Sequence, residues 1–208
     1  FGLGIHFCSK CPEICFKNLS IQNIEPNVKC SSDEDCFSFE GCQGLSLNEN
    51  YIKELNINEI NLKEYQKLHE IGSGGFGNVY LIRHKRTKKL FAAKKFFKEK
   101  KSKIDDFLNE LKINSEVNHP FIAKLIGYSL RDFDDEPSMI IITEYVENGS
   151  LERILYNERN GIAIPNVWNE TMKLINIYRI ASAIKYLHSK GILHLDITPS
   201  NILLDKFL

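Results

Sequence analysis

From residue 65 onward, hydrophobic and polar positions follow a series of strand and helix patterns. Short segments at 67–71 and 79–83 lie on either side of a glycine-rich stretch, and a third, preceded by a basic turn, follows at 90–97. Short segments with apolar and β-branched or aromatic residues, bounded by turn residues, are typical of strands. The three segments therefore predict three strands, the first two joined by a glycine-rich turn.

The next segment has a different period. Apolar residues recur at helical spacing over 104–117, which predicts an amphipathic helix that ends at His119-Pro120. Two further strands are predicted at 125–130 and 139–145. The second of these is apolar almost throughout, as expected for a buried strand.

After Asn148-Gly149 the pattern predicts helices. A short helix is expected near Ser150 and a longer one over 171–189. Six apolar residues are predicted to form the inner face of the long helix: Leu174, Ile177, Ile180, Ala181, Ile184 and Leu187. The order of elements predicts an α+β fold in which an antiparallel sheet carries one helix and further helices follow.

Composition and charge narrow the function classes. The 208 residues are 43% hydrophobic and 26% charged, as in soluble globular proteins. Basic and acidic residues balance at 27 each, so net charge does not indicate a nucleic-acid or membrane partner. No apolar run approaches the roughly 20 residues that span a bilayer. We therefore expect a cytoplasmic protein without a membrane segment.

The cysteines divide the chain. All six lie between Cys8 and Cys42. We therefore expect a Cys-containing segment of unknown fold at 1–45, a linker or short helix at 46–63, and one domain at 64–208. Cys8 and Cys11 have a spacing that suits zinc, but no second pair matches it. Reduced thiols without a special role, a zinc site and disulfides all stay open.

A glycine-rich motif joins the first two predicted strands. Glycine lets the backbone approach phosphate oxygens closely and adopt angles closed to other residues. A strand follows this motif, whereas a dinucleotide-binding turn opens a helix. A plain glycine-rich hairpin is the alternative interpretation. The motif consists of Gly72, Ser73, Gly74, Gly75, Phe76 and Gly77, followed by Val79.

The third predicted strand contains Lys94, in Phe91-Ala92-Ala93-Lys94. A lysine that faces inward from a strand needs an anionic partner, which the phosphates of ATP would supply. Glu110, inside the amphipathic helix, is the candidate carboxylate to hold Lys94. Glu116 is the competing choice, and Lys95 is expected to be a surface side chain.

These motifs together resemble the protein kinase family. In detail the chain is similar to the tyrosine-kinase-like branch of Ser/Thr kinases over residues 65–205, about two thirds of its length. The stretches that carry the branch resemblance are Phe107-Leu108-Asn109-Glu110, His119-Pro120-Phe121-Ile122, Leu125-Ile126-Gly127-Tyr128 and Ile142-Thr143-Glu144-Tyr145-Val146-Glu147-Asn148-Gly149-Ser150-Leu151.

The resemblance implies roles for the site residues. Lys94 would bind the ATP phosphates and Glu110 would hold Lys94 in place. Thr143 would be the gatekeeper at the back of the adenine pocket, and the backbone of Glu144 and Val146 would hydrogen-bond adenine. The side chains implied to sandwich the adenine ring are Ile71, Val79, Ala92 and Leu203.

The last motif matches H-x-D-x-x-x-x-N. By the same resemblance, Asp196 would accept the proton of the substrate hydroxyl and Asn201 would bind one Mg²⁺. A turn-forming aspartate is the alternative for Asp196. The motif is His194-Leu195-Asp196-Ile197-Thr198-Pro199-Ser200-Asn201.

Three residues depart from the family pattern. Leu195 stands where the family usually has Arg, which argues against control by a phosphorylated activation loop. Thr198 stands where Ser/Thr kinases usually have Lys, so we expect weaker stabilisation of transition-state charge. Asn114 occupies a usually apolar position. A buried Asn needs hydrogen-bond partners, so we expect its helix to be less firmly fixed.

The sequence therefore predicts an ATP- and Mg²⁺-dependent protein Ser/Thr kinase that acts on a protein hydroxyl. Because the chain does not begin with Met and contains no Asp-Phe-Gly, we expect a fragment that is inactive alone. The main alternative is a pseudokinase that binds nucleotide and acts as a scaffold or interaction module. The three departures favour that alternative, and the intact lysine, glutamate, aspartate and asparagine of the motifs oppose it. A Cys-rich interaction protein with a degenerate kinase half is a third possibility.

Overall fold

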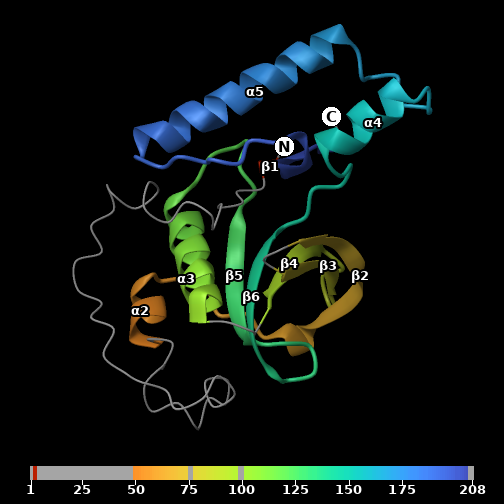
Figure 1. The fold of residues 1–208 in the computed structure, drawn as a ribbon. Coiled ribbons are helices and arrows are strands. Elements are labelled where there is room, and N and C mark those ends of the chain that lie inside the picture. Colours follow the sequence, from red (N-terminus) through yellow and green to blue (C-terminus); the bar gives the residue numbers. More distant parts are fainter. Residues whose placement is uncertain (1, 4–48, 75–76, 98–100, 206–208) are drawn as a thin grey trace. The chain divides into compact units, whose positions relative to one another are not determined.

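The computed structural model describes residues 2–3, 49–74, 77–97 and 101–205 (Figure 1). Gly75, Phe76 and all six cysteines lie outside the described residues, and with them the expectations for the Cys-containing segment. The chain forms two compact units. The sheet unit includes the described residues from 49 to 115 and 125–145, and the helical unit includes 2–3, 116–124 and 146–205.

The sheet unit contains a five-stranded antiparallel sheet in the order β2-β3-β4-β6-β5. One helix, α3 (Lys101–Glu116), lies beside it, as Figure 1 shows for α3 and β5. The predicted α+β fold is therefore confirmed. The strands are β2 (Tyr65–Gly74), β3 (Gly77–His84), β4 (Leu90–Phe96), β5 (Leu125–Arg131) and β6 (Pro137–Glu144).

Strand β6 shows how the apolar run folds. Ile140 and Ile142 are fully buried in one cluster, and Ile141 is 1% exposed in another. Successive side chains of a strand point to opposite faces, so a continuously apolar strand is buried on both sides. Each face of the sheet thus has its own apolar cluster, and α3 belongs to the one that contains Ile141.

Residues 49–64, which we call the strap, pack along the sheet unit. They contain helix α2 (Glu49–Glu54) and the 3₁₀ turn η2 (Leu62–Glu64). Between these two elements the backbone pairs in parallel with the edge strand β5. The Ile60 N–H donates to the Tyr128 carbonyl at 2.7 Å, and the Tyr128 N–H donates to the Asn58 carbonyl at 3.1 Å.

The strap is buried at two points. Ile52 is 1% exposed and Leu62 is 3% exposed. The sequence predicted a linker or a short helix here, and the structure shows the short helix and a further stretch that covers the edge of β5. An uncovered edge strand presents unpaired N–H and C=O groups, so the strap also satisfies part of the sheet's hydrogen bonding.

The helical unit is built on two helices, α4 (Leu151–Arg159) and α5 (Glu170–Ser189). Ile154, Trp168 and Leu204 form its apolar cluster. The turn η3 (Pro199–Asn201) leads into β7 (Ile202–Leu203), which pairs antiparallel with β1 (Gly2–Leu3). Among the described residues, no helix combines the length and apolar character needed to cross a membrane.

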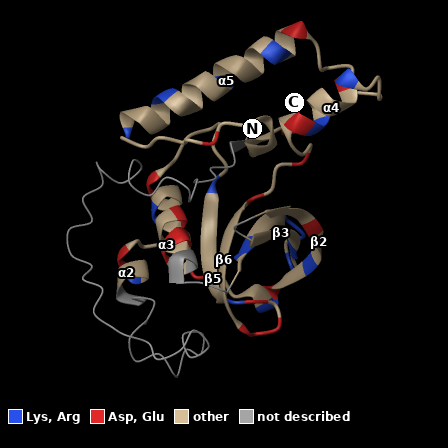
Figure 2. Cartoon of the chain, in the orientation of Figure 1, with Lys and Arg blue, Asp and Glu red and all other residues tan. Residues whose placement is uncertain are grey.

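The predicted inner face of α5 was partly wrong. Leu174 and Ile177 are 66% and 62% exposed, and Ala181 is also exposed. The buried residues of this helix are Asn176, Ala183 and Leu187. Most of this helix is neither acidic nor basic, as its tan colour in Figure 2 shows. When apolar residues surround most of a helix, their spacing does not single out one buried face.

We predict that Gly127→Ala destabilises the protein by displacing the strap. A Cβ at Gly127 would clash with the Asn58 carbonyl oxygen and lie 2.7 Å from Ile60 Cγ1. The free energy of unfolding should fall by about 1–3 kcal/mol, which is typical of overpacking. Urea unfolding followed by circular dichroism measures this change.

Gly74→Ala is the matched control for this prediction. A Cβ at Gly74 would meet nothing within 4 Å, so the change should stay within about 0.5 kcal/mol. Equal unfolding midpoints for the two variants would contradict the tight packing of the strap on β5.

Candidate functional site

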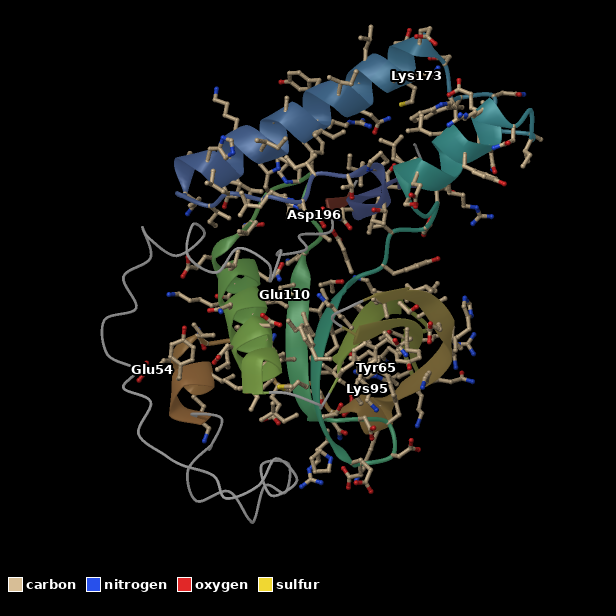
Figure 3. All side chains as sticks on the ribbon, viewed as in Figure 1. Glu54, Tyr65, Lys95, Glu110, Lys173 and Asp196 are labelled. Atoms are coloured by element: carbon tan, nitrogen blue, oxygen red, sulfur yellow. The ribbon has the colours of Figure 1, made fainter. Side chains whose placement is uncertain are left out.

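Lys94 and Glu110 form a buried ion pair in the sheet unit. Strand β4 supplies the lysine and α3 supplies the glutamate, which Figure 3 labels on that helix. Lys94 Nζ lies 2.6 Å from Glu110 Oε2, and each side chain is 11% exposed. Removing one partner would leave an uncompensated buried charge. The pair therefore fixes the orientation of α3 toward β4.

Burial raises the pKa of Glu110 above its ordinary value of 4.5, although the Lys94 ammonium acts in the opposite direction. The ammonium also lies over the Phe96 ring, 4.8 Å from its centroid. A cation close to an aromatic face is attracted by the ring quadrupole. Lys94 is thus held by both a carboxylate and a ring.

Three further predicted site residues lie on the same face of the sheet as Lys94. Val79 is directly opposite Lys94, and Ala92 is directly opposite Thr143. Ala92 and Lys94 are two residues apart on one strand, so their side chains point to the same face. The register thus brings Val79, Ala92, Lys94 and Thr143 together.

Lys95 points to the opposite face and is half-buried, whereas the sequence predicted a surface side chain. Its Nζ lies 2.7 Å from Asp132 Oδ2. The other oxygen of this carboxylate accepts hydrogen bonds from the N–H groups of Asp134 and Glu136. Sequence reasoning missed this pair because Asp132 lies 37 residues away in a turn.

The described glycines of the glycine-rich motif have different surroundings, so the missing side chain has a different structural effect at each. Gly77 has φ +154°, and a Cβ there would clash with the Lys95 carbonyl, with its carbon at 2.9 Å. Gly77 is therefore needed for the approach of β3 to β4. A Cβ at Gly74 would meet nothing within 4 Å, and one at Gly72 would meet only Val79 Cβ at 3.9 Å. The open space beside these two glycines fits the close approach of a ligand.

The adenine-binding residues implied by the resemblance are divided between the units. Ile71, 40% exposed, and Glu144, opposite Phe91, belong to the sheet unit. Val146 and Leu203 belong to the helical unit. There the segment after Val146 is held to the segment around Leu203 by two backbone hydrogen bonds: Asn148 N–H to Leu204 O at 2.9 Å and Leu204 N–H to Gly149 O at 2.8 Å.

Asp196 and Asn201 lie together in the helical unit. The Asn201 side-chain amide donates to both the Asp196 carbonyl and Asp196 Oδ2, each at 2.9 Å. The Asp196 N–H donates to the carbonyl of His194, a residue that is 3% exposed. The buried histidine and the asparagine therefore fix the aspartate from two sides.

The loop that carries Asp196 is strained. Leu195 has φ +55°, which is unusual for a residue other than glycine and costs of order 1–3 kcal/mol. Such strain persists only where the surrounding structure imposes it, and it occurs often at functional sites. Thr198 Oγ1 lies 2.8 Å from Ser200 Oγ, so the Thr198 hydroxyl has a partner within the loop.

The residues present fit a Mg²⁺ ion of the kind that bridges protein and phosphate. Because the amide nitrogen of Asn201 is bound to Asp196, its amide oxygen is the atom suited to a metal. Mg²⁺ prefers oxygen ligands and is usually held by one or two protein groups together with substrate phosphates. Among the described residues, no group of three or more His, Cys, Asp or Glu side chains could hold a metal by itself.

Asn114, predicted to need a partner if buried, is 8% exposed. Its side-chain amide donates to the Glu110 carbonyl at 2.8 Å, one turn earlier in α3. This bond lies within the helix and does not attach α3 to another element. That α3 is less firmly fixed at this point stays a prediction.

Comparison with known proteins gives consistent results. A family model described as "Protein kinase domain" matches residues 65–207. The Aurora kinase of Saccharomyces cerevisiae is 33% identical over 148 residues, which cover 70% of this chain and 37% of that protein. "Tyrosine-protein kinase receptor svh-2" of Caenorhabditis elegans is 35% identical over 174 residues, 79% of this chain and 15% of the receptor. Protein kinase 3 of Dictyostelium discoideum is 30% identical over 197 residues, 93% of this chain and 20% of that protein. The chain thus spans well under half the length of these relatives.

The raised pKa of Glu110 predicts a pH dependence of stability. Since the folded state holds the proton more tightly than the unfolded state, Glu110 favours folding at pH values below 4.5. This contribution is lost as pH rises through the folded-state pKa. The free energy of unfolding of wild type minus that of Glu110→Gln should therefore fall as pH increases.

Urea unfolding of both proteins over a pH series measures this difference. Glutamine has the shape of glutamic acid and does not titrate, so contributions from ionisable groups that do not interact with Glu110 cancel. A difference that grows with pH would mean that Lys94 outweighs burial, and would contradict the prediction.

Proposed function

The chain belongs to the protein kinase family, and we propose that the protein containing it is an ATP-dependent protein Ser/Thr kinase. The observation that carries this proposal is the buried Lys94–Glu110 pair with its 2.6 Å contact. A buried lysine held by a carboxylate, on the same sheet face as the apolar side chains of Val79 and Ala92, is suited to a phosphate beside a purine ring. The family match over 65–207 supports a domain that begins near residue 64.

In this proposal ATP binds through several parts of the chain. Gly72 and Gly74 leave open space for the phosphates, and Lys94 neutralises part of their charge. Thr143 and the backbone of Glu144 and Val146 contact adenine. When bound, Mg²⁺ would neutralise phosphate charge, with the amide oxygen of Asn201 as one ligand.

The chemistry assigned to the helical unit is proton removal. Asp196 accepts the proton of a protein hydroxyl, and that oxygen bonds to the γ-phosphorus of ATP. The bond between the γ-phosphorus and the bridging oxygen breaks, and ADP leaves with the bonding electrons. Asn201 holds Oδ2 of the aspartate at 2.9 Å, so the other carboxylate oxygen can take the proton.

Ser/Thr specificity is supported by the branch resemblance. The relatives include Aurora kinases and a protein named as a tyrosine kinase receptor, so the acceptor residue is the finer part of the proposal. Phosphoamino-acid analysis of the product distinguishes serine and threonine from tyrosine. We also propose that the reaction takes place in the cytoplasm, where ATP and protein substrates are present.

The second candidate function is a pseudokinase that binds nucleotide without transferring phosphate. It is favoured by Thr198, whose hydroxyl lies 2.8 Å from Ser200 Oγ and supplies no positive charge. We therefore propose that residues 1–208 alone bind nucleotide without measurable transfer.

We predict that Lys94→Met weakens ATP binding by the chain about tenfold or more, because charge-assisted hydrogen bonds contribute roughly 1.5–3 kcal/mol. In a form of the protein that transfers phosphate, Lys94→Met and Asp196→Asn should each abolish that transfer. Titration calorimetry and radiolabel transfer measure the two effects.

Lys95→Met is the matched control, since the neighbouring lysine is also ion-paired but faces away from Lys94. ATP affinity should stay within about twofold of wild type, as expected for a residue outside the binding site. If Lys94→Met retains full affinity and activity, the assignment of Lys94 is wrong.

We further predict that Thr198→Lys raises turnover of an active enzyme. A cation at this position would neutralise charge on the transferring phosphate, and such contacts are worth roughly 2–4 kcal/mol by analogy with oxyanion-hole donors. A tenfold increase requires only about 1.4 kcal/mol. Steady-state kinetics on a peptide substrate would compare the two proteins.

The outcome separates the two candidate functions. If both proteins bind ATP and neither transfers phosphate, the pseudokinase is the better assignment. If wild type is already fast and the lysine variant slower, another basic group fills the role, and the interpretation of Thr198 as a defect fails.

A further inference from the structure

The strap, residues 49–64, reaches the same apolar cluster that supports the Lys94–Glu110 pair. Ile52, 1% exposed, packs in a cluster whose α3 members are Phe107 and Leu111, both fully buried. Residues three and four apart share a face of a helix, so Phe107 lies on the same side of α3 as Glu110 and Leu111. The side of α3 that carries the glutamate is therefore also the side that Ile52 helps to bury.

The cluster also touches the strand that carries the lysine. Phe96 is a member, 1% exposed, two residues after Lys94 on β4. Its ring lies against the Lys94 ammonium, with 4.8 Å between the nitrogen and the ring centroid, and is edge-on to the Phe107 ring at 5.5 Å between centroids. One apolar cluster thus connects Ile52 to both partners of the ion pair.

The polar residue Asn114 in α3 makes this apolar cluster more important for holding the helix. Asn114, one turn after Glu110, is buried and donates its amide to the Glu110 carbonyl. This amide bond lies within the helix, so it does not hold α3 against a neighbouring element. The apolar anchorage next to Glu110 then comes from Phe107 and Leu111, where Ile52 packs.

The strap itself is held in a defined register. Its backbone pairs with β5 on both sides of Glu59, and Gly127 allows an approach that a side chain would block. At its other end, Lys63 Nζ lies 3.0 Å from Asp135 Oδ2, and the Glu64 carbonyl accepts from the Lys85 N–H at 2.8 Å. Residues 58–64 of the strap are thus fixed by bonds to the sheet, and Ile52 is held by its packing in the apolar cluster.

We propose that Ile52 is a positioning residue for the Lys94–Glu110 pair, and that the strap orients α3 for nucleotide binding. The strap precedes residues 65–207, the part that matches the kinase family model, so it is an addition to the matched domain. The expected change in ATP affinity rests on the proposed function. The expected change in the Lys94–Glu110 ion pair does not.

The test compares Ile52→Ala with Leu62→Ala in the full 208-residue chain. Leu62 is a matched control, because it belongs to the same strap and is 3% exposed. Its cluster lies on the other face of the sheet and has no α3 residue among its buried members, which are Leu62, Ile82, Phe91, Ala93, Ile140 and Ile142.

Both variants should lower the urea midpoint, because each removes a buried apolar side chain. Only Ile52→Ala should accelerate hydrogen exchange at the α3 amides and acylation of the Lys94 amine, each by about tenfold, since local opening controls both rates. Its affinity for ATP should fall by about the same factor, while Leu62→Ala stays within about twofold of wild type.

A double-mutant cycle tests whether Ile52 acts through Glu110. In a Glu110→Gln background, Ile52→Ala should cause no further change in Lys94 acylation or ATP affinity, because the group it positions is already lost. Ile52→Val removes only one methylene, so its effects should have the same direction as those of Ile52→Ala and be much smaller. Should Ile52→Ala fail to fold, Ile52→Val and the matched Leu62→Val give the same comparison, and only Ile52→Val should accelerate exchange at the α3 amides and acylation of Lys94.

The results separate this inference from the proposed function. Equal effects of Ile52→Ala and Leu62→Ala on Lys94 acylation, or additive effects with Glu110→Gln, would overturn the positioning role. If wild type binds no ATP, the proposed function fails, while exchange and acylation still decide whether the strap positions the pair.

Discussion

The buried ion pair between Lys94 and Glu110 is the interaction on which the sheet unit's proposed function depends. Two charges that are each 11% exposed are stable only while their 2.6 Å contact is kept, because desolvation of an unpaired charge is costly. Burial already raises the pKa of the glutamate. A small displacement of α3 would therefore remove the contact without removing the cost of burial, so the structure must hold α3 accurately.

The sheet meets this requirement through alternation of its side chains. One face carries Lys94, Val79, Ala92 and Thr143, and it is also the face on which α3 packs. The other face carries an apolar cluster that contains Leu62 of the strap. The strap crosses the β5 edge and contributes one buried side chain to each cluster, so it links the support of α3 to the stability of the sheet.

The helical unit holds its own polar group by different means. Asp196 is fixed by hydrogen bonds from Asn201 and to His194, in a loop where Leu195 adopts a positive φ. These contacts join residues two to five positions apart, so the conformation of the motif at 194–201 depends mainly on its own residues. In the sheet unit, by contrast, the lysine and glutamate are brought together by strand register and helix packing. The two halves of the proposed chemistry therefore differ in how strongly they depend on distant residues.

The sequence by itself determined the order of elements and the fold class, because strand and helix periods are local in the chain. The kinase resemblance made Glu110 the candidate partner of Lys94, and only the packing of α3 on the sheet brings the two charges to 2.6 Å. The sequence did not determine which side chains of α5 are buried, since Leu174 and Ile177 have the same apolar character as Leu187. It also gave no sign that Lys95 pairs with Asp132, or that Ile52 and Gly127 fix the strap on β5. These contacts join segments far apart in the sequence, and only tertiary packing decides which of many similar apolar and charged residues meet.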